Sequence, residues 1–540
     1  MTPKQRLVVI GNGMAGAKFV QELLARDGGK QFDIVVFGEE RYGNYNRILL
    51  SSVVAGSHEP KDILLNSIAW YAENGVTLHA GLRVECIDRE QKIVRSAGGI
   101  QEPYDKLVFA TGSRPFVPPI GGLPGIGVFT FRTLDDAFQI MEHAAQARKV
   151  FVVGGGLLGL EAARGLLNRG LEVHVIELMP YPMSIQLDPA AGAVLRSTLE
   201  KMGIQFHLGK SITSAIGAIK IEGVTLSDKT TESCDMLVIS AGIRPNVEIA
   251  KQAGLAVERG ILVGDDLACV NDSSVFAVGE CMQHRGQTYG LVTPGSEQAK
   301  VLADRLSGAK PLAAYTGSNI STTLKVMGVD LAVLGDKEPK GDTDLVFTYS
   351  DAQHGIYKKV ILREGLLAGA ILLGDCTAAP RLLRTFHKGE VLRENPADLV
   401  FPTVATVGPS DTSAEDSIEP LKEVIAIIRP DQWVKTKLKA ESLGITAFTH
   451  HRVFGRGRQR GLNFLARRGA HSGTGFRFLP KRMISWIVPE SEVDVLVQAI
   501  METNRTGQIG DGKIFVLPLD ETMQIQTDEA RTEELQPALS

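Results

Sequence analysis

The chain has 540 residues, more than one hydrophobic core usually organises, so its length predicts several domains. Hydrophobic residues make up 44% of it, and 57 glycines fit a glycine-rich α/β protein and exclude a disordered one. The net charge of −4 argues against a protein whose whole surface binds nucleic acid or a membrane.

The N-terminus leads from Lys4 and Arg6 directly into a strand pattern, so we expect no leader peptide and a cytoplasmic protein. No uncharged apolar run approaches the ~20 residues that span a bilayer. The cysteines stand singly, with no CxxC pair, which predicts reduced thiols and no iron–sulfur, zinc or other metal site. They are Cys86, Cys234, Cys269, Cys281 and Cys376.

The first chemical motif follows a buried-strand pattern at residues 7–10 and leads into a helical pattern. It is a GxGxxG turn, in which glycines let backbone N–H groups approach a pyrophosphate at a helix N-terminus. A second strand, residues 33–37, ends near Glu39 and Glu40, and a carboxylate there can bind ribose hydroxyls. We favour Glu40, although spacing does not separate the two. The turn residues expected at the phosphate are Gly11, Gly13, Met14, Ala15 and Gly16.

The same arrangement recurs after a strand at residues 150–153. Its second strand, residues 172–176, ends in Glu177, and residues 178–180 contain no arginine to meet a 2′-phosphate, which favours NADH over NADPH. Two complete units in one chain predict hydride transfer between two dinucleotides. The turn residues expected to bind the second dinucleotide are Gly154, Gly156, Leu158 and Gly159.

Three further strand–turn patterns, at residues 104–112, 236–242 and 275–280, follow in the order expected of such a chain. Each pattern alone indicates only an ordinary strand end. The order in which they follow one another along the chain is what supports a protein with two dinucleotide-binding units. The cofactor-binding residues expected there are Ala110, Thr111, Gly112, Gly242, Gly279 and Glu280.

Residues 6 to about 395 resemble the FAD/NADH-binding part of assimilatory NADH-dependent nitrite reductases and of related rubredoxin reductases. The resemblance implies that Arg47 lies by the FAD pyrophosphate, that Glu280 meets the ribityl chain, and that Glu161 faces the nicotinamide–flavin contact as the catalytic residue. Some relatives have a lysine at the position of Ser52 and an aspartate at that of Glu280. The motifs are GNGMAG at 11–16, NYNRILLS at 44–51, ATGSRP at 110–115, GGGLLGLEAARGL at 154–166, AGIRPN at 241–246, FAVGEC at 276–281, YGLV at 289–292 and IYKK at 356–359.

Full-length nitrite reductases of this kind continue into segments with clustered cysteines, and disulfide reductases carry a dithiol; this chain has neither. We therefore expect hydride transfer from NADH to FAD, with the electrons leaving to a separate acceptor, either a nitrite reductase component or a rubredoxin-like protein. An NADH oxidase that uses O₂ directly is a weaker alternative, because none of the single cysteines suits it.

Residues 319 to about 374 show five strand patterns, which predict a third, smaller domain. In relatives this part receives the electron acceptor, and a plain packing or dimerisation domain is an equally good interpretation. A polar, acidic stretch at 408–419 then predicts a linker.

After the linker, a strand at 423–430, a helix at 433–443 and a strand at 447–454 are followed by a second strand–helix–strand series at 483–517. Two units of this size predict a ferredoxin-like repeat. We place the start of the first helix at Asp431, as its N-cap.

Residues 422 to about 527 resemble the nitrogen regulatory PII family, through KEVIAIIRP at 422–430, FGRGRQRG at 454–461, FLPK at 478–481 and TGQIGDGKIFVLP at 506–518. The resemblance implies ATP or ADP at a trimer interface, with 2-oxoglutarate and Mg²⁺ nearby. The regulatory ligand-binding residues would be Gln459, Lys481, Thr506, Gly507, Gly510, Gly512 and Lys513.

Three features of this part bear on its regulation. Residues 442–489 contain no Asp or Glu, so its arginine-rich loop is either a solvated basic hairpin or, as we favour, a site for an anion or an acidic target protein in nitrogen metabolism. Gln524 and Gln526 stand where PII proteins commonly have arginines, which weakens the expected nucleotide binding. No tyrosine follows Tyr357, so tyrosyl uridylylation cannot operate there.

The sequence thus predicts an α/β and α+β multidomain protein: two Rossmann-like dinucleotide-binding units, a small reductase C-terminal domain and a ferredoxin-like PII domain. The leading hypothesis is an NADH-dependent FAD oxidoreductase regulated by its own sensor; the alternative is a PII-type regulator whose flavoprotein part senses redox state. The expected boundaries are 1–115 with 245–315 (FAD), 116–244 (NAD), 316–395 (reductase C-terminal domain), 396–420 (linker), 421–530 (PII) and 531–540 (tail).

Overall fold

A computed structural model describes residues 3–318, 321–389, 391–392, 396–401, 421–441, 443, 445, 448–455, 479–505 and 512–518. The chain divides into two units, residues 1–405 and 406–540. None of the helices in these described stretches is long and apolar enough to cross a membrane.

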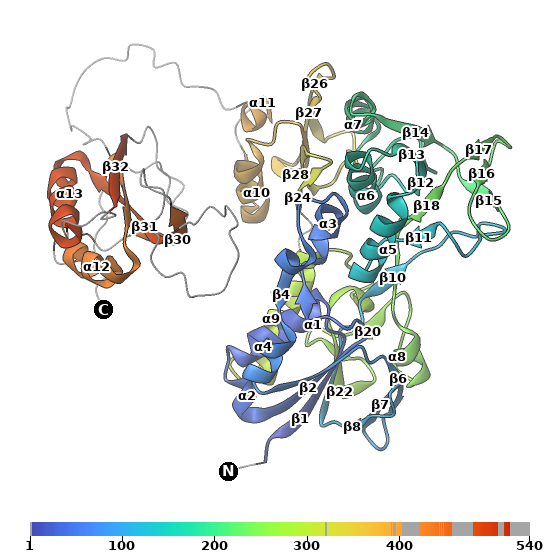
Figure 1. Cartoon of the computed structure of the whole chain (residues 1–540), viewed down its shortest axis with the longest axis horizontal. Helices are drawn as coiled ribbons and strands as arrows, with labels where there is room; N and C mark the ends of the chain where they lie inside the picture. Colours follow the sequence, from blue (N-terminus) through green and yellow to red (C-terminus); the bar gives the residue numbers. More distant parts are fainter. Residues whose placement is uncertain are drawn as a thin grey trace, which may run out of the picture. The chain divides into compact units, whose positions relative to one another are not determined.

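The first sheet of unit 1 has eight strands and joins two separated stretches of the chain (Figure 1). Its five adjacent strands β5, β2, β1, β9 and β22 are parallel, and β5 lies at one edge. Residues 7–10 of β1 are buried on both faces, as their unbroken apolar run predicts. Helices α1 and α9 pack together against this sheet. In sheet order the strands are β23 (Met282–His284), β20 (Ile261–Val263), β21 (Ala268–Cys269), β22 (Asp272–Ala277), β9 (Lys106–Phe109), β1 (Gln5–Ile10), β2 (Phe32–Gly38) and β5 (Val76–Ala80), with α1 at Met14–Leu24 and α9 at Val292–Leu306.

The second sheet has five parallel strands and carries the second glycine turn. Two short antiparallel strands, β10 (Ser113–Pro115) and β19 (Ile243–Pro245), pair where the chain passes into and out of this part. In sheet order the five strands are β11 (Val128–Thr130), β18 (Met236–Ile239), β12 (Lys149–Val153), β13 (Glu172–Glu177) and β14 (Ile204–Leu208), with helices α5 (Leu134–Ala144), α6 (Leu157–Asn168) and α7 (Pro189–Lys201).

Shorter elements fill the edges of these two sheets. Helix α2 (Gly28–Gln31) lies between α1 and β2. The segment between β2 and β5 holds β3 (Asn44–Tyr45), η1 (Arg47–Leu49), α3 (Leu50–Val54), η2 (Pro60–Ile63), β4 (Leu64–Asn66) and α4 (Ile68–Glu73). Two three-stranded sheets comprise β6 (Val84–Asp88), β7 (Ile93–Ser96) and β8 (Gln101–Pro103), and β15 (Ile212–Ile216), β16 (Gly223–Leu226) and β17 (Thr231–Ser233); α8 (Glu248–Gln252) and η3 (Gly279–Cys281) complete this part.

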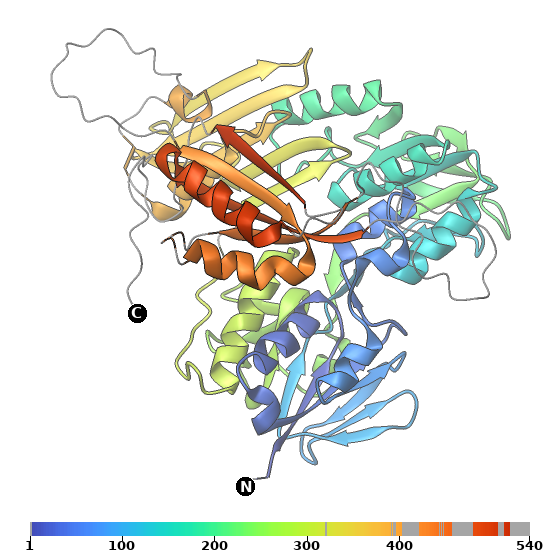
Figure 2. The same cartoon turned by 60° about the vertical axis from the view of Figure 1, so that its left-hand side comes forward.

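The third sheet of unit 1 is antiparallel and lies beside helices α6 and α7 of the second (Figure 2). Because successive side chains of a strand point to opposite faces, Tyr357 joins the core of the second sheet while Val360 joins a separate core under α10 and α11. All five predicted strands are confirmed. They are β24 (Ser321–Val326), β25 (Val329–Gly335), β28 (Leu366–Leu373), β27 (Ile356–Arg363) and β26 (Leu345–Asp351) in sheet order, with α10 at Ala379–Lys388 and α11 at Pro396–Val400.

Unit 2 confirms the ferredoxin-like prediction, with the strand order β30-β31-β29-β32, all antiparallel. Both helices, orange and red in Figure 2, lie on one face of the sheet, over Val424, Ala426 and Ile428. The opposite face exposes Ile487 and Phe515 by more than two fifths each. The elements are β29 (Leu421–Ile428), η4 (Pro430–Gln432), α12 (Trp433–Glu441), β30 (Thr449–Gly455), β31 (Leu479–Pro489), α13 (Glu490–Asn504) and β32 (Lys513–Pro518).

One local prediction is wrong. Asp431 is not the N-cap of α12, because Pro430 begins a 3-10 turn that contains Asp431 and ends at Gln432, directly before Trp433. Proline at the first position of such a turn has its φ already set for it, so the chain turns two residues earlier than expected. The six domain boundaries remain predictions.

Candidate functional site

Each of the three glycines of the first turn is required, or tolerated, for a different structural reason. Gly11 has a φ of +116°, and a Cβ there would lie 2.1 Å from the carbonyl oxygen of Ala110. A Cβ on Gly16 would lie 2.1 Å from the carbonyl oxygen of Gly11, so only glycine lets α1 approach the turn this closely. A Cβ on Gly13, by contrast, would meet nothing within 4 Å. Gly13 therefore faces open space at the N-terminus of α1, where a phosphate can approach.

The second turn repeats this geometry. Gly154 has a φ of +112°, with Ser240 O 2.3 Å from an added Cβ, and a Cβ on Gly159 would lie 2.0 Å from Gly154 O. Gly156, before the first residue of α6, again faces open space. Leu158 lies in the first turn of α6, as Met14 and Ala15 lie in the first turn of α1. Both predicted turns therefore leave a helix N-terminus open to the approach of an anion.

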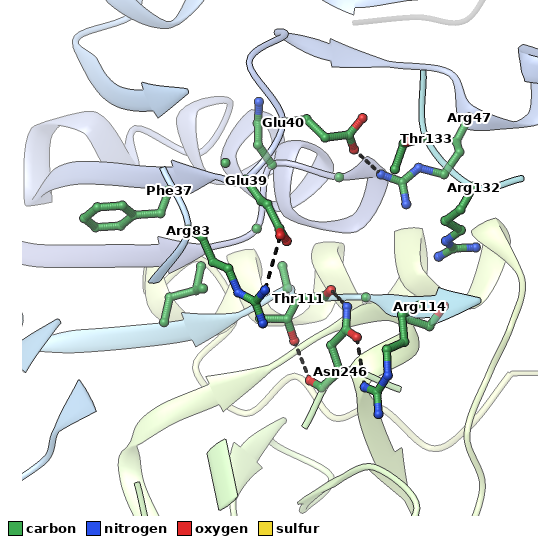
Figure 3. A pocket seen from close by; sticks show the side chains of 18 of the residues that line it. Phe37, Glu39, Glu40, Arg47, Arg83, Thr111, Arg114, Arg132, Thr133 and Asn246 are labelled. Carbon is green, nitrogen blue, oxygen red and sulfur yellow. Dashed lines mark hydrogen bonds and ion pairs between the residues drawn. The ribbon is translucent and has the colours of Figure 1, made fainter. Parts of the chain in front are cut away.

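A cavity of about 730 Å³ extends from the first turn, and its wall includes Glu39, Glu40, Arg47, Thr111 and Gly112 (Figure 3). This volume is within the range of small-molecule and cofactor sites.

Glu40 and Glu39, the two candidates for the ribose, differ in their partners. Glu40 Oε1 accepts from Arg47 Nη2 at 2.6 Å and Oε2 from the Tyr45 hydroxyl at 2.6 Å. Glu39 is 69% exposed and lies 3.6 Å from Arg83 Nη1. Glu40 thus orients Arg47, which leaves Glu39 the more accessible carboxylate; the choice of Glu40 for the ribose stays a prediction.

Glu280 lies on η3, which follows β22, and contacts two residues of the cavity wall, Ser113 and Arg132. Its Oε2 accepts from the Ser113 hydroxyl at 2.5 Å and from Arg132 Nη2. Burial, the largest influence, lowers the pKa of Arg132, with the Glu280 carboxylate opposing it. Arg132 Nε is buried with no partner, and Figure 3 shows its guanidinium next to that of Arg47. A buried, unsatisfied donor beside a second arginine suits an anionic ligand.

The turns that contain Thr111 and Asn246 are hydrogen-bonded to each other. Thr111 Oγ1 donates to Asn246 O, and Asn246 Nδ2 donates to Thr111 O, both at 2.8 Å. Gly112 and Gly242 have φ values of +63° and +111°, and an added Cβ on either would meet nothing. Of these residues, Thr111, Gly112 and Asn246 form part of the cavity wall.

Position 279 requires glycine because its φ is +82° and because an added Cβ would lie 2.8 Å from the Cβ of Ala15. The strand-end turn that carries Glu280 thus packs directly on the start of α1.

Glu177 closes on the second turn, as its spacing predicts. Its Oε2 accepts from the backbone N–H of Gly155 at 2.6 Å, and its Oε1 accepts from that of Met179 at 2.8 Å. Leu178 and Met179 are largely exposed beside it. The carboxylate is held at the mouth of the turn, where ribose hydroxyls can reach it.

Glu161, on α6, has partners from two other parts of unit 1. Its Oε2 accepts from the Ser51 hydroxyl at 3.1 Å, and its Oε1 accepts from the backbone N–H of Met327 at 3.0 Å. Ser51 lies on α3, and Met327 has a φ of +52° in the turn between β24 and β25. The carboxylate is thus oriented by one hydrogen bond on each of its oxygens.

The five cysteines are all free thiols, and three of them, Cys234, Cys269 and Cys281, are buried. Burial raises the pKa of Cys281, whose Sγ lies 3.3 Å from Val278 O. A buried thiol with a raised pKa is a poor nucleophile, which weighs against the direct oxidase alternative. Within the described stretches, no three His, Cys, Asp or Glu side chains gather as a metal site would require.

Of the regulatory residues, only three are described. Gly512 has a φ of +123°, and a Cβ there would lie 2.0 Å from Ile427 O, so this glycine is required for packing against β29. Lys513 begins β32, and Lys481 lies on β31. Gln459, Thr506, Gly507 and Gly510 lie outside the described residues, as do Gln524, Gln526 and most of the basic loop.

Sequence reasoning missed Ser51, Ser113, Arg132 and Met327 as contacts of the expected site. The first two stood inside motifs that had been noted, NYNRILLS and ATGSRP. Arg132 carried no local signal beyond its place before Thr133, which caps α5. Met327 contributes only a backbone N–H, which no side-chain pattern reveals.

Comparison with protein families gives three matches along the chain. Residues 5–299 match the pyridine nucleotide-disulphide oxidoreductase model, 321–390 the C-terminal domain of rubredoxin NAD+ reductase, and 421–529 nitrogen regulatory protein P-II. The matches confirm the two resemblances expected from the motifs.

Individual relatives agree with this assignment. The chain is 42% identical over 416 residues to a nitrite reductase [NAD(P)H] of Bacillus subtilis (76% of this chain, 51% of the relative). It is 42% identical over 385 residues to an assimilatory nitrate reductase electron transfer subunit of the same organism (71% and 49%). It spans about half the length of these curated relatives.

Among solved structures, NADH:rubredoxin oxidoreductase from Clostridium acetobutylicum shares the fold, with a TM-score of 0.62 at 23% identity, covering 74% of this chain and 100% of that one.

Proposed function

The chain belongs to the pyridine nucleotide-disulphide oxidoreductase family of NAD(P)H oxidoreductases, and on this premise we propose that it oxidises NADH with FAD as its bound cofactor. The observation that carries the proposal is the duplicated turn: Gly13 and Gly156 each face open space at a helix N-terminus in otherwise tight glycine turns. Bound FAD would accept the hydride from NADH and pass its electrons on.

The residues at the first turn fit FAD. The amides around Gly13 can bind its pyrophosphate, and Arg47, held by Glu40, can neutralise it. Arg132, with its unpartnered Nε, offers a second guanidinium to the same anion. Glu280 can then bind the hydroxyls of the ribityl chain.

The second turn fits NADH. Glu177 already accepts two backbone N–H groups, and its remaining lone pairs can bind the 2′- and 3′-hydroxyls of a ribose. A 2′-phosphate would bring negative charge against this carboxylate, and residues 178–180 have no arginine to offset it. NADH is therefore preferred over NADPH.

Hydride transfer requires alignment of two rings and exclusion of water more than acid–base chemistry. Glu161 serves alignment here: with Ser51 on one oxygen and the Met327 N–H on the other, its carboxylate is fixed on α6. A fixed carboxylate can orient the nicotinamide end of NADH toward the flavin.

We propose further that the electrons go to a separate protein, either a nitrite reductase component or a rubredoxin-like protein. One relative named above is an electron transfer subunit, which supports delivery to a partner. The five free cysteines offer no dithiol or cluster to hold the electrons on this chain.

The C-terminal domain is proposed as a sensor of ATP or ADP, with Mg²⁺ and 2-oxoglutarate, that regulates this delivery according to nitrogen status. Its match to the P-II model supports this role. The partly apolar sheet face with Ile487 and Phe515 would be covered in a trimer. Its basic loop would dock on an acidic target protein of nitrogen metabolism.

The first test is spectroscopic. The purified protein should be yellow, and anaerobic NADH should bleach its flavin absorbance, faster than NADPH does. Gently purified protein without bound flavin would contradict the proposal.

The second reading, a PII-type regulator whose flavoprotein part senses redox state, is supported by the same P-II match. Comparing the full chain with one ending at Glu419 separates the two. Regulation of the reductase predicts that ATP, ADP or 2-oxoglutarate changes NADH:ferricyanide turnover in the full chain only. If these ligands leave the turnover unchanged in both forms, regulation within the chain is refuted and the redox-sensing regulator hypothesis is favoured.

A further inference from the structure

Glu177 and the segment that follows it are hydrogen-bonded to both backbone polar groups of one residue in the second glycine turn, Gly155. Glu177 accepts from the backbone N–H of Gly155, and the N–H of Met183 donates back to Gly155 O at 2.9 Å. Met183 itself is buried and has a φ of +56°. The position of the turn therefore depends on where residues 178–188 are held.

The far end of this segment is held from the third sheet. Lys337, which follows β25, extends its Nζ to the carbonyl oxygens of Ser184 and Leu187, the latter at 3.2 Å. An ammonium group with two carbonyl acceptors fixes the backbone of the segment directly.

Asp188, the last residue of the segment, is held by the same sheet. Its Oδ2 accepts from Lys359 Nζ at 2.8 Å and from the Tyr357 hydroxyl at 2.7 Å, while Oδ1 caps α7 through the N–H of Ala191. Asp188, Tyr357 and Lys359 are 3%, 2% and 6% exposed. Both oxygens of this buried carboxylate are thus paired within the protein.

The two strand residues reach Asp188 because they are two apart on β27, so both face the second sheet. Lys358 between them points the other way, to Asp375 at 2.7 Å. The two neighbouring lysines of the IYKK motif therefore contact different parts of the protein. Of these two, only Lys359 contacts the part of the chain that carries the second glycine turn.

We propose that Lys337, Tyr357 and Lys359 are positioning residues for NADH: from the third sheet they hold residues 178–188, and through them Glu177 and the turn at Gly155. The inference rests on the proposed binding of NADH at this turn. It assigns the third sheet a part in donor binding, besides either role expected for it from the sequence.

The expected effect is on NADH affinity rather than on the hydride-transfer step. If the segment is released, only a fraction of molecules holds the turn in its binding geometry, and the apparent Kd rises by the inverse of that fraction. The other end of the NADH site, at Glu161, keeps its partners Ser51 and Met327.

The test uses the full-length protein with Lys337→Met, which keeps the aliphatic stem and removes the ammonium. Lys340→Met is the matched control, because Lys340 lies on the same loop and pairs with Asp336 at 2.9 Å, away from the segment. We expect Lys337→Met to raise the KM for NADH and the Kd for NAD+ about fivefold, with kcat for ferricyanide reduction within about twofold and flavin content unchanged. The control should match the wild type.

Hydrogen–deuterium exchange gives a readout that needs neither flavin nor turnover. Lys337→Met should speed exchange in residues 178–188, and Lys337→Arg, which restores a cation with donors, should recover part of both effects. Lys359→Met should change exchange and the KM for NADH in the same direction, but it leaves the buried Asp188 carboxylate without its cation and can unfold the protein. The Lys337 variants are therefore the decisive test.

Unchanged exchange and unchanged KM in Lys337→Met would overturn the inference, as would a fall in kcat with KM unaltered. Failure of the underlying function has a different signature: wild-type protein that neither binds NAD+ nor bleaches with NADH.

Discussion

Valine at Gly156 or Gly13 tests whether each glycine turn serves its own dinucleotide. Gly156 has φ −80° and ψ 178°, and Gly13 has φ −74° and ψ −174°, a region that valine adopts without strain. In both places the added Cβ would meet nothing within 4 Å. The folded protein should therefore accept either change, at a cost of about 1 kcal/mol for a poorer helix N-cap.

The cost to binding should be larger than the cost to folding. A side chain at Gly156 projects into the space where phosphate would approach the backbone amides. Loss of one charge-assisted hydrogen bond of about 1.5–3 kcal/mol corresponds to a roughly 10- to 150-fold weaker Kd.

The assay compares the two variants for flavin content and for NADH bleaching. Gly156→Val should keep its flavin and lose NADH affinity, whereas Gly13→Val should be purified largely without flavin. Gly159→Ala is the contrasting control: its Cβ would lie 2.0 Å from Gly154 O, so it should impair folding itself.

The reasoning is refuted if Gly156→Val binds NADH as the wild type does, or if it loses flavin while Gly13→Val keeps it. Either result would mean that the turns do not bind the two dinucleotides as assigned.

Three further predictions concern side chains. Arg132→Leu leaves Glu280 without its cation and should weaken FAD binding at least tenfold, roughly one charge-assisted hydrogen bond, measured as flavin retained on dilution. Glu161→Gln has one carbonyl oxygen for two donors, so stopped-flow bleaching by NADH should slow about tenfold; an unchanged rate would remove Glu161 from alignment. Burial alone would raise the pKa of Asp188, but its hydrogen bonds, led by the one from Lys359, hold that pKa below its ordinary value. The ion pair of Asp188 and Lys359 therefore stabilises the fold above about pH 4, and this stabilisation is lost as the pH falls further. Asp188→Asn should therefore cost about 3 kcal/mol in urea unfolding at pH 7 and progressively less below about pH 4; a constant difference across that range would contradict the sign.

Much of the fold could be read from the sequence, since strands and helices have local periodicity. The apolar run before Gly11 became β1, and the strand pattern within residues 319–374 that includes IYKK became β27. In unit 2 the predicted elements were found within a few residues, except at Asp431, where Pro430 starts a turn that hydrophobic spacing does not report.

The sequence by itself determined the two glycine turns and Glu177 beside the second, because these features are contained within about 30 residues of chain whose geometry glycine dictates. It did not separate Glu39 from Glu40 beside the first. Only the tertiary structure decided which groups hold the carboxylates in place. Glu161 is 110 residues from Ser51 and 166 from Met327, and Asp188 is 171 from Lys359. Such partners meet only when separate sheets pack together, and no spacing along the chain encodes which lysine of a pair will face the neighbouring sheet.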